Sequence, residues 1–109
     1  MGDEVAGPIP ETLQQFLERC RTHRIDVVLL APPATAAVRR IYTPEREDRF
    51  QAFIRGVTDR FGIPFVDYRA RLDDRFFNDG VHLAPGGGVR LAELLAAEVI
   101  VPRRAAPAR

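Results

Sequence analysis

The chain has 109 residues, in which 16 basic and 15 acidic side chains leave a net charge of +1, so it is long enough for one domain and no more. A charge balance this close to neutral lacks the basic surface that nucleic acids and anionic membranes attract, and we expect neither as a partner. The apolar and charged fractions, 46% and 28%, are typical of a folded globular domain.

The cysteine and histidine content excludes further classes. Cys20 is the single cysteine and has no partner for an internal disulfide, while His23 and His82 are too far apart in sequence to form a recognisable metal-binding motif. We therefore expect no metal and no cofactor. The acidic start of the chain is not followed by an apolar signal segment, and the longest apolar runs are too short for a membrane span, so the default expectation is a cytoplasmic location.

Apolar residues at helical spacing predict a first helix between Pro10 and Arg24. Its buried stripe consists of Leu13, Phe16, Leu17 and Cys20. The aliphatic run from Ile25 to Ala31 follows directly and is typical of a strand buried on both faces, which Pro32 and Pro33 end.

A second helix has clear signals at both ends. Thr43 can cap its first turn, Pro44 suits the first helical position, and Gly62 can supply a left-handed stop. Residues 63–68 then form a second predicted strand. A strand, a helix and a strand of these lengths predict a βαβ unit with two parallel strands.

A third helix is predicted after the polar stretch 69–78 and a glycine-rich turn, with Leu91, Leu94, Leu95 and Val99 on its buried side. We expect this helix to end before Pro102 and residues 103–109 to form a flexible tail. The predicted fold is therefore α/β, a βαβ unit with two parallel strands and about three helices, within a domain of residues 1–102.

The best candidate for chemistry is the pair Asp79 and His82, which lies between the last strand and the last helix, where open parallel sheets bind ligands. A carboxylate that accepts the Nδ1 hydrogen of a histidine leaves Nε2 free to act as a general base. Gly80 would let the intervening turn adopt unusual dihedrals. The plainer alternative is that Asp79 and Gly80 form a turn and His82 caps a helix.

Other polar residues have structural and functional interpretations as well. Arg39 and Arg40 follow the first strand, where they could hold an anionic substrate or form part of a solvated loop. Cys20 is expected to be buried and inert, and Thr43 is expected to be a helix cap. We do not expect Cys20, Thr35 or Thr43 to act as a catalytic nucleophile in place of a serine.

Three stretches between Leu13 and about Ile100 resemble the SGNH (GDSL-type) serine hydrolases: a strand ending in prolines at 29–33, the pair Val66-Asp67, and an Asp-x-x-His-x-x-x-x-Gly block at Asp79, His82 and Gly87. The resemblance implies a carboxyl-terminal fragment of a three-layer, flavodoxin-like fold. It further implies that His82 is the general base, that Asp79 orients it, and that the substrate is an acyl ester or a carbohydrate. The sequence is closest to the branch of the family that O-acetylates polysaccharides.

The chain departs from the family in one decisive respect, because it contains no serine. The Gly-Asp-Ser block and the oxyanion donors of the family have no counterpart before Leu13. We therefore expect the carboxyl-terminal part of an esterase or O-acetyltransferase, from a truncated or split gene, that is inactive alone. The exposed edge of strand 25–31 would pair with a second copy or with a separate amino-terminal half. The alternative is a small non-catalytic α/β interaction module.

Overall fold

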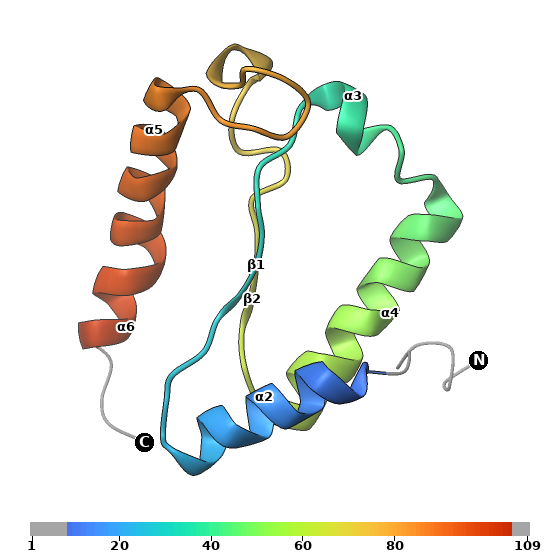
Figure 1. The fold of residues 1–109 in the computed structure, drawn as a ribbon, viewed down its shortest axis with the longest axis vertical. Helices are drawn as coiled ribbons and strands as arrows, with labels where there is room; N and C mark the ends of the chain where they lie inside the picture. Colours follow the sequence, from blue (N-terminus) through green and yellow to red (C-terminus); the bar gives the residue numbers. More distant parts are fainter. Residues whose placement is uncertain (1–8, 106–109) are drawn as a thin grey trace. The chain divides into compact units, whose positions relative to one another are not determined.

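The structure is a computed structural model that describes residues 9–105. Its elements are α2 (Glu11–Thr22), β1 (Leu29–Ala31), α3 (Ala36–Arg39), α4 (Pro44–Phe61), β2 (Phe65–Asp67), the short 3-10 turn η1 (Asp74–Phe76) and α5 (Pro85–Leu95), which continues through η2 (Ala96–Ile100) into α6 (Val101–Ala105) (Figure 1). The strands are parallel, with Leu30 opposite Val66. The predicted α/β class and the parallel pair are confirmed.

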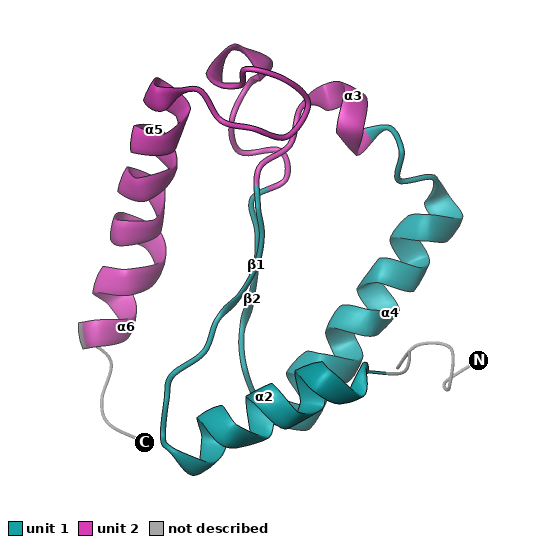
Figure 2. Ribbon diagram, in the orientation of Figure 1, with its two compact units in different colours: residues 1–32, 40–68 teal, residues 33–39, 69–109 magenta. Residues whose placement is uncertain are grey.

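The chain divides into two compact units (Figure 2). The first comprises residues 1–32 and 40–68 and contains α2, α4 and both strands. The second comprises residues 33–39 and 69–109 and contains α3, η1 and the helical segment from α5 to α6. The predicted candidate site lies within the second unit.

Helix α4 begins and ends where its sequence predicts. The Thr43 hydroxyl accepts the Arg46 backbone N–H at 3.3 Å, and Pro44 occupies the first turn, where its missing N–H leaves no bond unmade. At the other end Gly62 has φ 65° and donates its N–H to the Thr58 carbonyl. These local signals fix the helix at 18 residues.

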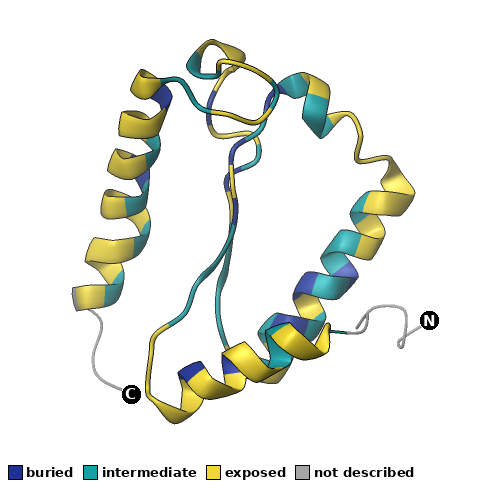
Figure 3. Cartoon of the chain, in the orientation of Figure 1, coloured by how far each residue is buried: buried dark blue, intermediate teal, exposed yellow. Residues whose placement is uncertain are grey.

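The core of the first unit consists of the inward sides of α2 and α4 and the end of β1. Its buried apolar residues are Leu17, Cys20, Ala31, Ala52, Ile54, Val57 and Tyr68. Figure 3 shows buried stretches on α2 and α4. Arg21 ties the helix ends together, because its guanidinium donates to the Arg60 carbonyl at 3.0 Å and lies over the Phe61 ring.

Strand β1 is shorter than the predicted strand 25–31, which is wrong over residues 25–28. Helix α2 ends in a left-handed turn at Arg24, φ 57°, and the Ile25 N–H bonds back to the Cys20 carbonyl at 2.8 Å. This closure keeps Ile25 out of the sheet, with 57% of its surface exposed. Leu29 and Leu30 are half-buried, so the expectation of burial on both faces is also wrong.

The last helix extends beyond its predicted end. Helix α6 contains Pro102 and continues to Ala105, so the expectation that the helix ends before Pro102 is wrong. A proline inside a helix lacks an N–H and crowds the carbonyl four residues earlier, here that of Glu98. The π-helical turn η2 contains Glu98, and its wider spacing is a local adjustment that relieves such crowding. Residues 103–105 of the expected tail are thus helical, and residues 106–109 lie outside the described residues.

Helix α3 occupies part of a stretch predicted as a loop. Its first amide, from Ala36, donates to the Asp74 carboxylate at 2.9 Å, and the Arg39 N–H reaches the Thr35 carbonyl at 2.9 Å. Asp74 is distant in sequence, so this capping group had no local signal. In residues 9–105 no helix combines the length and the apolar character of a membrane span.

Candidate active site

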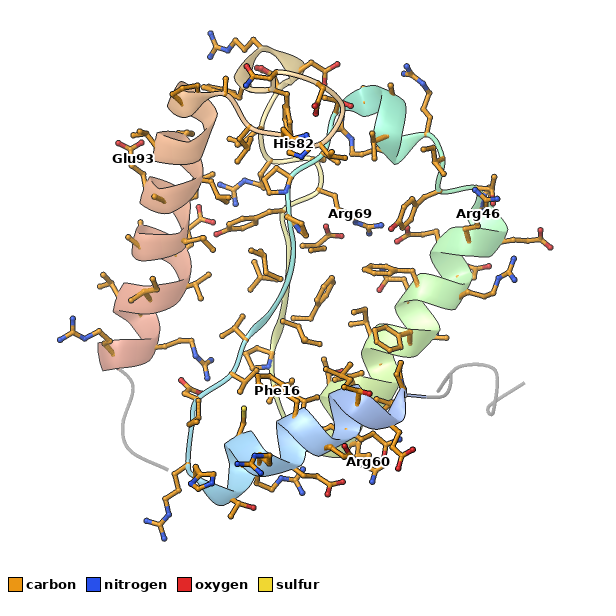
Figure 4. All side chains as sticks on the ribbon, in the orientation of Figure 1. Phe16, Arg46, Arg60, Arg69, His82 and Glu93 are labelled. Carbon is orange, nitrogen blue, oxygen red and sulfur yellow. The ribbon has the colours of Figure 1, made fainter. Side chains whose placement is uncertain are left out.

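Asp79 and His82 lie in a short closed loop that precedes α5, where Figure 4 labels His82. The loop is closed by backbone hydrogen bonds from Asn78 N–H to the His82 carbonyl at 2.8 Å and from Ala84 N–H to the Phe76 carbonyl at 2.9 Å. An antiparallel bridge between Phe77 and Leu83 completes the closure. The backbone thus holds the ends of the Asp79–His82 turn together.

The predicted contact between the two side chains is present. Asp79 Oδ2 lies 2.7 Å from His82 Nδ1, while Asp79 Oδ1 accepts the backbone N–H groups of Val81 at 2.9 Å and His82 at 2.7 Å. Because an ionised carboxylate only accepts hydrogen bonds, Nδ1 must carry the hydrogen, and Nε2 of the neutral ring keeps its lone pair. The His82 side chain is 77% exposed and that of Asp79 is 55% exposed. The ring can therefore be reached by a reactant.

The structure bears on both interpretations of this turn. His82 does not cap a helix, because α5 starts at Pro85 with Ala84 as its capping residue. Asp79 does stabilise a turn through its Oδ1, as the plainer interpretation expects. The same carboxylate thus fixes the backbone with one oxygen and the imidazole with the other.

Gly80 has a different role from the one predicted. Gly62 is the glycine with positive φ among residues 9–105, so the expectation that Gly80 adopts unusual dihedrals is wrong. A Cβ at Gly80 would instead lie 2.9 Å from Val38 Cγ2 and 3.8 Å from the Thr35 hydroxyl. Gly80 is thus required because segment 33–39 approaches the turn closely.

The electrostatics of the turn favour an ionised Asp79. Its pKa is lowered from 3.8 to about 2, first by the Val81 N–H, then by the His82 N–H and then by the His82 ring. Hydrogen bonds to the charged form are the main cause, and burial has little part in a side chain this exposed. Asp79 is therefore ionised at neutral pH and cannot donate a proton to His82.

This gives the first testable prediction. We expect the Asp79 carboxyl carbon to titrate in NMR with a midpoint near 2, below the ordinary value of 3.8. Because the folded-state pKa is depressed, the contribution of Asp79 to stability is complete above pH 3.8 and is lost as the pH falls towards 2. A midpoint for Asp79 near 3.8 would show that the turn does not form in solution.

Segment 33–39 supports this loop through residues that sequence reasoning did not connect with it. Thr35 donates its hydroxyl to the Gly80 carbonyl at 3.2 Å, and its own surface is 8% exposed. The Nη1 group of Arg39 donates to the backbone carbonyls of Ala34 and Arg69, so this side chain helps to hold the segment in place. These pairs are separated by up to 45 residues, and no sequence signal indicates them.

Three side chains with a thiol or hydroxyl group are buried or already hydrogen-bonded. Cys20 is buried in α2, the Thr43 hydroxyl caps α4, and the Thr35 hydroxyl bonds to a carbonyl. The part of the chain that the structure describes also contains no group of three or more His, Cys, Asp or Glu side chains arranged for a metal ion.

Comparisons of the chain with models of protein families, with curated proteins and with solved structures find no match.

Proposed function

We propose that this chain is the carboxyl-terminal part of an SGNH-type serine esterase or carbohydrate O-acetyltransferase, with His82 as general base and Asp79 as its orienting partner. The observation that supports this most is the 2.7 Å contact between Asp79 Oδ2 and His82 Nδ1, on a ring that is 77% exposed. This is the arrangement that holds a catalytic histidine in the Nδ1–H tautomer. The family resemblance adds the identity of the missing partner, a serine.

The chemistry follows from the orientation of the ring. Nε2 of His82 takes the proton of a serine hydroxyl as the serine oxygen attacks the acyl carbonyl, and the imidazolium then returns the proton to the departing alcohol. Asp79 stays ionised and stabilises the imidazolium, as its pKa of about 2 requires. A water or a sugar hydroxyl, deprotonated by the same base, then attacks the acyl-serine; the acyl group passes to its oxygen, and the imidazolium returns the proton to the serine oxygen. Because the 109 residues contain no serine, the nucleophile comes from outside this sequence.

The strand β1 is the proposed attachment point for that partner. The Leu29 N–H bonds to the Pro64 carbonyl and the Ala31 carbonyl accepts the Tyr68 N–H, so these groups face β2. Because alternate residues of a strand bond to opposite sides, the N–H and C=O of Leu30 belong to the other edge of β1. Unpaired edges of this kind pair with added strands.

We therefore expect the isolated chain to self-associate through this edge. Leu30→Pro removes the outward donor and leaves the bonds at Leu29 and Ala31 in place, so it should weaken association about tenfold, as the loss of one hydrogen bond implies. Leu30→Ala keeps the donor and is the matched control for the lost side chain. Sedimentation velocity over a range of concentrations measures the effect. A wild-type chain that is monomeric at all concentrations and melts cooperatively contradicts the proposal of an open, sticky edge.

The function itself is tested by complementation. The full chain is mixed with the separate amino-terminal half of an SGNH hydrolase, which carries the Gly-Asp-Ser block, and hydrolysis of p-nitrophenyl acetate is followed. Turnover in the mixture that neither part shows alone, and that His82→Ala removes, supports the proposal. A stable complex without turnover favours the alternative, a non-catalytic interaction module.

A further inference from the structure

We propose that Thr35 is a positioning residue for the Asp79–His82 pair, because it holds the Gly80–Val81 peptide group in the orientation that aims the Val81 N–H at Asp79. This inference rests on the proposed function, in which Asp79 orients His82 as a general base. The contacts that support it lie within the second unit.

One peptide group is fixed at both ends. Its carbonyl, from Gly80, accepts the Thr35 hydroxyl at 3.2 Å and the Thr35 backbone N–H at 3.3 Å. Its N–H, from Val81, donates to Asp79 Oδ1 at 2.9 Å. Because the C=O and N–H of a trans peptide point in opposite directions, the orientation of the carbonyl decides where the N–H points.

Thr35 is well placed for this role, since its surroundings leave it little freedom. Its surface is 8% exposed, and among the polar residues at positions 9–105 it alone is buried. Neighbouring bonds fix its segment, because the Ala34 N–H reaches the Arg69 carbonyl at 3.1 Å and Asp74 holds the Ala36 N–H at 2.9 Å. The two donors of Thr35 are thus presented to Gly80 from a fixed backbone.

The absence of a side chain at Gly80 makes the contact possible. A Cβ there would meet Val38 Cγ2 at 2.9 Å, and Val38 belongs to the short helix that Thr35 precedes. The close approach and the two hydrogen bonds therefore depend on one another. Without the Thr35 hydroxyl, the peptide group can rotate more easily and withdraw its N–H from Asp79.

The test uses Thr35→Val, which removes the hydroxyl and keeps the size of the side chain. We expect hydrogen exchange of the Val81 amide to accelerate about fivefold to tenfold, and the NMR signals of the His82 ring nitrogens to shift towards those of a mixture of tautomers. Thr35→Ser keeps the hydroxyl and should restore both signals. Thr58→Val is the matched control, because it removes a hydroxyl bonded to a carbonyl on the exposed face of α4.

Unchanged Val81 exchange and unchanged His82 signals in a folded Thr35→Val chain would overturn the proposal, as would failure of Thr35→Ser to restore them. The wild-type chain offers a measurement that needs no variant. The Thr35 hydroxyl proton should exchange slowly enough to be observed, with a cross-peak to the Gly80 α protons, and rapid exchange with water would also overturn the proposal. None of these measurements involves turnover, so they stand apart from the outcome of complementation.

Discussion

Replacement of Gly87 by alanine is expected to lower the free energy of unfolding by about 3 kcal/mol, the upper range for forcing extra volume into a packed site. A Cβ at Gly87 would lie 2.2 Å from the Phe76 carbonyl oxygen, 3.0 Å from Leu83 Cδ2 and 3.1 Å from Phe76 Cβ. The Phe76 carbonyl cannot move aside easily, because it accepts the Ala84 N–H that closes the Asp79–His82 loop. Chemical denaturation followed by circular dichroism measures the effect.

The neighbouring glycines provide matched controls. Gly86 and Gly88 lie in the same helical turn, and a Cβ at either would meet nothing within 4 Å. Because alanine is the better helix former, Gly86→Ala and Gly88→Ala should each leave stability unchanged or raise it by up to about 1 kcal/mol. If Gly87→Ala were as stable as these two variants, the contact between α5 and the loop would not exist in solution.

Loss of the imidazole in His82→Ala is expected to reduce kcat of the complemented enzyme by about 10⁴-fold or more, the usual effect of removing the base of a Ser-His-Asp triad. The side chain is 77% exposed, so the substitution should leave folding unaffected. His23→Ala is the control, because His23 follows α2 in the first unit and has no part in the proposed chemistry. A drop in kcat of similar size for both variants would contradict the role of His82.

Asp79→Asn tests whether the tautomer of His82 matters, because it keeps the imidazole that His82→Ala removes. An asparagine oxygen can still accept the Val81 and His82 N–H groups, but its NH₂ would then face Nδ1 and favour the wrong tautomer. We expect kcat to fall by about 10²- to 10⁴-fold while the turn persists. Retention of full activity would show that Asp79 serves the turn alone.

The parts of the fold that the sequence predicts well are those fixed by local signals. Helix α4 depends on Thr43 and Pro44 at its start and Gly62 at its end, all within or beside the helix, and it has the predicted bounds. The end of α2 was harder to predict, because Arg24 adopts a left-handed conformation that usually favours glycine. The predicted end of the last helix before Pro102 is wrong for a related reason. The π turn that accommodates this proline has no sequence signature.

The same distinction applies to the candidate site. Asp79 and His82 are three residues apart, so a turn alone brings them together, and the sequence was sufficient to predict their contact. Thr35 bonds to Gly80, which is 45 residues away in the sequence. Asp74 bonds to Ala36, which is 38 residues away and follows Thr35 directly. Contacts of that separation depend on the fold, and a single sequence does not indicate them. The close approach of Val38 to Gly80 is likewise a property of the fold, and the sequence does not predict it.

We propose that His82 is an oriented base that completes an active site when a serine is supplied. The most direct measurement is the rate at which a fluorophosphonate labels the serine of a separate amino-terminal half, because this reaction requires an activated hydroxyl. We expect rapid labelling of the serine when the wild-type chain is bound. We expect slow labelling when the His82→Ala chain is bound to the same extent. Equal rates in the two complexes would contradict it.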